Sequence, residues 1–130
     1  MMTTRLEVTS TEIQDNIIQF NTNSENLPEN LTLEPSGQVL VDSDSLSFIY
    51  ILETDDSFIY VSIPKDHWTG LKKVMEEEKE AVLNLSDHQT ISLKGLKDEM
   101  DYLTQNISGN ANYGSEMMSS VEEIFQPEKD

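Results

Sequence analysis

The chain has 130 residues and a mass of 14.8 kDa, and its 25 acidic residues against 8 basic ones leave a formal net charge of -17. This length and a hydrophobic content of 36% predict one folded domain with one core. Arg5 is the only arginine and the lysines are scattered, which excludes a phosphate-contacting surface for duplex nucleic acid. The absence of cysteine excludes disulfides, thiolate zinc sites and thiol nucleophiles.

Hydropathy gives no sign of a membrane segment. No run of residues approaches the roughly 20 apolar positions that cross a bilayer, and residues 1–10 lack the apolar core of a signal peptide. We therefore expect a cytoplasmic protein that does not bind membranes. The sequence leaves its oligomeric state open.

The N-terminal half has the alternation that is typical of β-strands. Residues 5–10 and 13–21 alternate apolar and polar side chains and predict a hairpin that turns at Thr11 and Glu12. Residues 21–38 are mostly polar, proline or glycine and predict a long loop. Three leucines in this loop favour a short edge strand that holds part of the loop against the fold; they are Leu27, Leu31 and Leu33.

Two dense runs of β-forming residues follow. Residues 46–52 and 58–63 flank a polar connection of hairpin length, so they predict an antiparallel pair. Both runs are apolar on both faces, which indicates strands in the middle of a covered sheet.

The C-terminal half predicts three helices and a second hairpin. Asp66 is placed to cap a helix that runs to about Lys79, and residues 81–85 and 90–93 predict the hairpin. Apolar residues at helical spacing predict a helix over 93–109. Ser115 is placed to cap the last helix, whose methionine-rich stripe we expect to pack on the protein's own sheet.

Together these elements predict a single α+β domain over residues 1–126, followed by a frayed tail at 127–130. We expect an antiparallel sheet of about five or six strands, with three helices mainly in the C-terminal half. The predicted core consists of Phe48, Tyr50, Leu52, Phe58, Tyr60, Trp68, Leu71, Leu96, Met100, Leu103, Val121 and Phe125.

One passage resembles the start of a calcium-binding loop. Asp42 and Asp44 stand at its first and third positions and Glu53 at its twelfth. Leu46 and Ser47 stand where such a loop needs an oxygen ligand and a glycine turn, so a turn held by aspartate hydrogen bonds is favoured.

Other polar clusters have a plain interpretation as solvated surface. A cation site would need Asp42, Asp44 and either Asp55 or Asp56 to converge. The two histidines stand in different elements, one at a helix start and one in a turn, without the spacing of a helical zinc motif. No serine stands in a nucleophile motif. We therefore predict no catalytic residue, metal ligand or cofactor.

Two sequence blocks carry a resemblance. GQVLVDSD at 37–44 precedes FIYIL at 48–52, and NISGNANYGSEM at 106–117 precedes VEEIF at 121–125. In these blocks the chain resembles a YjbL-like family of small uncharacterised proteins from Bacillus and Staphylococcus relatives. The resemblance covers about the last 90 residues. It implies a cytosolic protein of a low-GC Gram-positive bacterium and no particular activity.

The same blocks hold polar residues that a packed core does not require. If the strand start and the final linker meet in space, these residues form one polar binding patch. The predicted binding residues are Asp42, Asp44, Asn110, Asn112 and Tyr113.

The composition favours a non-catalytic, acidic interaction or regulatory module that binds a protein with a basic surface. The excess of 17 negative charges would speed encounters with a cationic partner and make binding sensitive to salt. One alternative is a divalent-cation-binding protein or metal-dependent enzyme that uses Asp42 and Asp44. A second is an inhibitor that mimics DNA with its carboxylates.

Overall fold

A computed structural model of the chain describes residues 4–22, 32–55, 57–85 and 89–125. Within these residues the chain forms seven strands, three α-helices and two short 3-10 helices. Their bounds are β1 Thr4–Ile13, β2 Ile17–Thr22, β3 Glu34–Asp42, β4 Ser47–Glu53, β5 Phe58–Pro64, η1 Lys65–His67, α1 Trp68–Glu77, β6 Glu80–Leu85, β7 Gln89–Ser92, α2 Leu96–Ile107, η2 Ala111–Tyr113 and α3 Ser115–Phe125. The predictions for Leu27, Leu31, Asp56, His88 and residues 127–130 lie outside the described residues.

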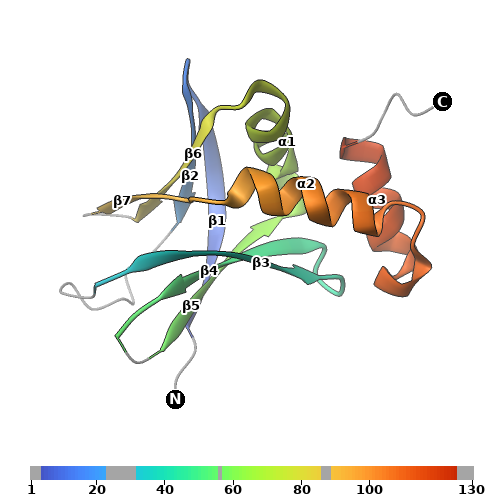
Figure 1. Cartoon of the computed structure of the whole chain (residues 1–130), viewed down its shortest axis with the longest axis horizontal. Helices are drawn as coiled ribbons and strands as arrows, with labels where there is room; N and C mark the ends of the chain where they lie inside the picture. Colours follow the sequence, from blue (N-terminus) through green and yellow to red (C-terminus); the bar gives the residue numbers. More distant parts are fainter. Residues whose placement is uncertain (1–3, 23–31, 56, 86–88, 126–130) are drawn as a thin grey trace.

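The described strands form one mixed sheet in the order β3-β4-β5-β1-β2-β6-β7. Neighbours are antiparallel except that β1 runs parallel to β5 and β2 runs parallel to β6. The sheet curls into a half-barrel, with the helices on its inner side (Figure 1). The α+β class and the three helices are confirmed, whereas the prediction of five or six antiparallel strands is wrong in number and direction.

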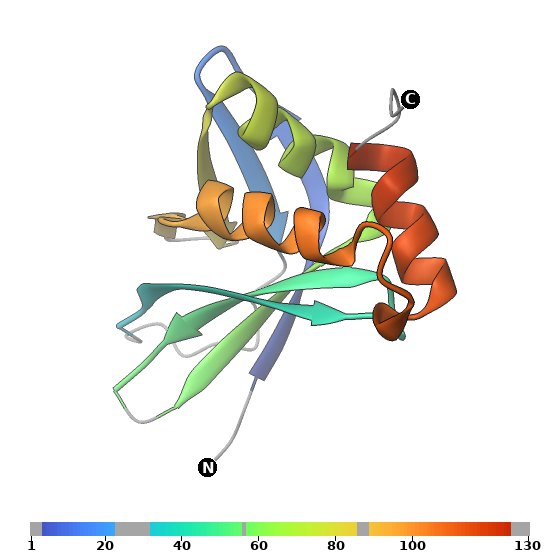
Figure 2. The ribbon, with the colours of Figure 1, turned by 45° about the vertical axis from the view of Figure 1, so that its right-hand side comes forward.

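The N-terminal hairpin occupies the centre of the sheet. Its turn lies at residues 14–16 and not at Thr11 and Glu12, which continue the strand opposite Phe20 and Gln19. Polar residues such as Thr11 and Glu12 can continue a strand when they face solvent. Their polarity was therefore mistaken for a turn. The crossover from β5 through α1 to β6 passes over this hairpin (Figure 2). Gly70 allows the close approach, because a Cβ there would lie 2.9 Å from the Thr11 side chain.

Strand β3 contains residues that look like loop in the sequence. Pro35 is tolerated because β3 is an edge strand. The pairing with β4 shifts between Pro35 and Val39, and Gly37 takes a φ of 77° at this bulge. Leu33, just before the strand, packs against the core. The predicted loop is wrong at its C-terminal end, because residues 34–38 belong to β3.

The inner face of the sheet carries the core. In β5 the inward residues are Ile59, Val61 and Ile63, whereas Phe58 and Tyr60 point to the other face. The prediction of Phe58 and Tyr60 as core residues is therefore wrong. Both faces of this strand are apolar, so alternation alone did not say which face the helices cover.

Helices α1 and α2 begin later than predicted, after Asp66 and after Leu93 respectively. Asp66 lies inside η1 and caps nothing, and α1 starts at Trp68. Helix α2 starts after Gly95, whose φ is 77°. No helix in the described part of the chain is long and apolar enough to cross a membrane.

The last helix packs on its own fold, as predicted. Met117 and Val121 are buried, and Phe125 is partly buried. The Phe125 ring lies 5.7 Å from Trp68 and 6.1 Å from Phe48 between ring centroids. This aromatic cluster joins α3, α1 and β4.

The Tyr50 hydroxyl ties the edge strand β3 to the segment that leads into α2. It accepts a hydrogen bond from the Gly37 amide at 3.1 Å and donates one to the Lys94 carbonyl at 2.7 Å. Burial raises the pKa of this phenol, so it remains a neutral donor. Nearby, the Val39 amide donates to the Glu99 carboxylate at 3.4 Å. Side chains thus occupy edge amides of β3 and close the open side of the half-barrel against α2.

We predict that Tyr50→Phe lowers the free energy of unfolding by about 1–3 kcal/mol, because it strips both backbone groups of a partner in a buried place. Urea unfolding measures the loss. Tyr102→Phe is the matched control, because Tyr102 is 63% exposed, and we expect a change within about 0.5 kcal/mol. Equal stability of wild type and Tyr50→Phe would contradict the tie.

Candidate functional site

One face of the sheet is left bare by the helices. We call the side of β3, β4, β5 and β1 that points away from the helices the outer face. Its apolar centre is defined by cross-strand neighbours in register, which place Leu40 beside Ile49 and Ile51 beside Tyr60. The apolar centre consists of Leu40, Ile49, Ile51, Phe58 and Tyr60.

The apolar centre is buried in the middle and open at its sides. Ile49 and Ile51 are buried although they lie on the side of the sheet away from the described helices; Leu40 is beside Ile49 and Tyr60 is beside Ile51. Leu40 is 43% exposed and Phe58 is 40% exposed. Leu40 and Phe58, on the two strands that flank β4, therefore expose apolar surface at two points of the apolar centre. Exposed apolar side chains gathered on one face are the kind of surface that marks an interaction site.

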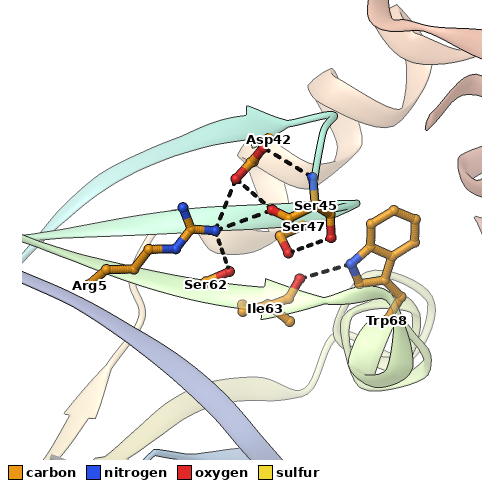
Figure 3. Close-up of polar contacts among 7 residues, drawn as sticks. All are labelled: Arg5, Asp42, Ser45, Ser47, Ser62, Ile63 and Trp68. Carbon is orange, nitrogen blue, oxygen red and sulfur yellow. Dashed lines mark hydrogen bonds and ion pairs between the residues drawn. The ribbon is translucent and has the colours of Figure 1, made fainter. Parts of the chain in front are cut away.

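Arg5 crosses one end of the outer face (Figure 3). From β1 its guanidinium donates to Ser62 of β5 at 3.1 Å, to Ser45 at 3.3 Å and to the Asp42 carboxylate at 3.0 Å. One side chain thereby links three segments that are far apart in the sequence. Sequence reasoning used Arg5 only as a count of cations and missed this role.

Asp42 is held on two sides. Its carboxylate accepts hydrogen bonds from the Ser45 hydroxyl at 2.6 Å and the Ser45 amide at 3.3 Å, in addition to the pair with Arg5. The hydrogen bond from Ser45 and that from Arg5 lower the pKa of Asp42, so the carboxylate stays charged. The aspartate-stabilised turn expected from the sequence is present, and Arg5 is the partner that the sequence did not reveal.

The opposite end of the outer face is acidic. Glu34 and Glu53 are directly opposite each other across β3 and β4, and Phe58 is opposite Glu53 on β5. Like charges in such a cross-strand pair repel. Neither glutamate has an ion-pair partner within the described chain. Glu7, exposed on β1, likewise has none among these residues.

A hollow of about 440 Å³ opens beside this acidic end. It lies between the start of β3 and the β4–β5 connection, and Phe58 contributes an aromatic ring to its lining. The lining residues are Thr32, Glu34, Glu53, Thr54, Asp55, Ser57 and Phe58. The hollow combines carboxylates with an apolar surface and no basic side chain among its lining residues.

The remaining part of the same sheet surface, over β1, β2 and β6, is polar, and its side chains are hydrogen-bonded to one another. Asn21 accepts from Gln19 at 2.8 Å and from Asn84 at 3.1 Å, and it donates to Ser10 and Glu12 at 3.0 Å each. These groups bond to one another, so this row offers fewer free donors and acceptors to a ligand than its composition suggests.

The five predicted binding residues do not form a single hydrogen-bonded cluster in the described chain. The turn that holds Asp42 and Asp44 and the linker before α3 lie at the same end of the molecule (Figures 1 and 2). Asn110 accepts from the Asn112 amide and so shapes η2, while Tyr113 packs against the core. Their role as a binding patch stays a prediction.

Among the described residues, Asp42, Asp44 and Asp55 do not converge, and Asp56 lies outside the described residues. Asp42 pairs with the first residue of β4, whereas Asp55 comes two residues after the last one, so about 20 Å of strand separates them. Among the described residues no three carboxylates or imidazoles are grouped to hold a metal ion. His67 is instead hydrogen-bonded through Nδ1 to the Thr11 hydroxyl at 3.0 Å, which joins η1 to β1.

Comparison with known proteins places the chain in a family. A model of a family of unknown function, UPF0738, matches residues 6–125. The chain belongs to the UPF0738 family. The expectation of an uncharacterised Bacillus family is thereby confirmed, while the name YjbL stays a prediction. The resemblance began at residue 37, and the family match extends it toward the N-terminus as far as residue 6. The N-terminal hairpin is therefore part of the family's domain.

UPF0738 relatives cover nearly the whole chain. The UPF0738 protein of Bacillus cytotoxicus is 41% identical over 124 residues, which are 95% of this chain and 99% of that protein. That of Bacillus mycoides is 42% identical over 124 residues with the same coverage. That of Bacillus cereus strain ZK / E33L is 42% identical over 129 residues. No solved structure gives a significant match.

We predict that Asp42→Asn lowers the free energy of unfolding by about 1 kcal/mol at neutral pH; the pair is partly open to water, with Arg5 46% and Asp42 23% exposed. Because the pKa of Asp42 is lowered from 3.8 on folding, its stabilisation is full above that value and is lost as pH falls through the folded-state pKa. The free energies of unfolding of wild type and Asp42→Asn should therefore become equal in acid. Denaturant unfolding between about pH 7 and pH 2 measures this.

Asp44→Asn is the matched control, because Asp44 is exposed and makes no hydrogen bond with the described residues. We expect it to change stability by less than about 0.5 kcal/mol. A constant difference between wild type and Asp42→Asn at every pH would contradict the assigned role of the ionised carboxylate.

Proposed function

We propose that this UPF0738 protein is a non-catalytic, acidic interaction module of the cytoplasm that binds a protein with a basic surface. The observation that carries the proposal is the separation of charge over the fold. Every described lysine lies on a helix, on η1 or on a segment next to a helix, and Arg5 is the one described cation on the outer face.

The described cations are largely neutralised within the chain. Six of them lie within 4 Å of a carboxylate: Arg5, Lys65, Lys72, Lys73, Lys79 and Lys97. The net charge of -17 is therefore carried by carboxylates that have no cation of their own, and those on the outer face lie beside exposed apolar side chains. Such a field accelerates encounters with a cationic protein and repels acidic ones.

Quantitative capture from a Bacillus lysate, with the full chain as bait, tests this function. We expect retained proteins to be basic at about 50 mM salt and to be depleted at least about tenfold at about 500 mM salt, because salt screens charge attraction. Chemical crosslinking identifies the protein in direct contact. Retention of the same proteins at both salt concentrations, or retention of none above empty beads, would overturn the proposal.

A triple variant separates the two surfaces that the chain offers. Asn110→Ala, Asn112→Ala and Tyr113→Ala together alter the linker patch predicted from the sequence, and circular dichroism checks that the variant folds. Loss of the partner would place the interface at this linker. Retention of the partner is the result expected if the outer face makes the contact.

A further inference from the structure

We propose that the outer face is the docking surface, and that it receives an extended partner segment with apolar side chains at alternate positions followed by lysine or arginine. This inference rests on the proposed function and names its surface and the chemistry that it recognises. Two independent features of the face support it, one apolar and one electrostatic.

The apolar feature is the half-open centre. Leu40 lies beside the buried Ile49, and Phe58 lies beside Glu53, two residues further along β4 than the buried Ile51. An apolar side chain above Ile49 would shield Leu40 from water, and the part of the same segment that continues toward Glu53 would shield Phe58. Removing the apolar area of these two side chains from water would stabilise the complex.

The electrostatic feature is the unrelieved pair of glutamates. Glu34 and Glu53 repel each other across the strands, at the rim of a hollow that Phe58 also lines. A lysine or arginine side chain in this hollow would neutralise the pair and contact the aromatic ring. The hollow is next to the apolar centre, because Phe58 belongs to both.

The register of β4 sets the spacing of the partner segment. Ile49, Ile51 and Glu53 point to the same side at intervals of two residues. A segment that lies along β4 in an extended conformation therefore matches them with alternate residues, two apolar and then one cationic. It lies on the face and does not add to the edge of β3 around the bulge, where Gly37 and Val39 already donate their amides to Tyr50 and Glu99.

Charge argues against a second copy of the chain as the occupant. Two such faces brought together would add the carboxylates of Glu34 and Glu53 to those of the partner copy, at a net charge of -17 each. A basic segment gains from the same carboxylates. The occupant we commit to is therefore a basic segment of a different protein.

The test uses the synthetic peptide acetyl-SLSLSKS-amide as the probe and two-dimensional amide NMR of the full chain as the readout. We expect chemical-shift changes confined to β3, β4 and β5, and weaker binding as salt is raised. Two control peptides replace either the leucines by serine or the lysine by glutamate. We expect each to bind at least about fivefold more weakly.

Variants of the chain test the surface itself. Leu40→Ser with Phe58→Ser should weaken peptide binding at least about fivefold, and Glu34→Gln with Glu53→Gln should weaken it and reduce its salt dependence. Ile13→Ser with Tyr102→Ser is the matched control, because both residues are exposed apolar side chains away from the apolar centre, and it should bind as wild type. Thermal melts confirm that each variant folds.

The outcomes distinguish the two proposals. Shift changes over the helices or residues 109–115, or equal binding of the leucine-free peptide, would overturn the outer-face inference and leave the acidic module standing. No binding of the lysine peptide at low salt would also overturn the inference, and the lysate capture then decides the proposed function alone. A chain that is dimeric in sedimentation and becomes monomeric on Leu40→Ser with Phe58→Ser would show self-association in place of a basic partner.

Discussion

The closure of the half-barrel depends on one buried hydroxyl. Tyr50 is fully buried in β4, and its oxygen joins the bulge of β3 to the carbonyl that precedes α2. The two segments approach so closely that a Cβ on Gly95 would lie 3.3 Å from the Cα of Gly37. Both glycines have a φ of 77°, which other residues rarely adopt. This contact fixes where α2 enters the core, and the helices then cover one face only.

Because one face takes all the helices, the other face is left to make different contacts. Its two ends have opposite character. Arg5 satisfies Asp42 at one end, whereas Glu34 and Glu53 at the other lie opposite each other without a cation from the described chain. The apolar centre lies between them. An acidic protein whose described lysines lie on or next to its helices thus presents a surface that is both negative and partly apolar.

The position of the N-terminal hairpin agrees with the range of residues that the family match covers. β1 and β2 lie between β5 and β6, so the C-terminal part of the chain needs them to complete its sheet. α1 crosses above them at Gly70. A domain that began at residue 37 would lack the middle of its sheet. The UPF0738 match from residue 6 agrees with this architecture.

The sequence alone determined the class of the protein, its strands and helices, and much of its core. Periodicity records which side of each element is apolar, so the β4–β5 pair, the β6–β7 pair and the buried stripe of α3 were predictable. For β5, which is apolar on both sides, the same signal could not choose a face, and Phe58 and Tyr60 were misplaced.

Only the tertiary structure decided which strand edges join and which charges meet. Parallel pairing of β1 with β5 links residues that are more than fifty positions apart, and nothing in a local pattern encodes that distance. The pair between Arg5 and Asp42 and the repulsion between Glu34 and Glu53 follow from this assembly. Hydrophobic periodicity is a property of neighbouring residues, whereas edge pairing and electrostatic contact depend on where the folded chain returns.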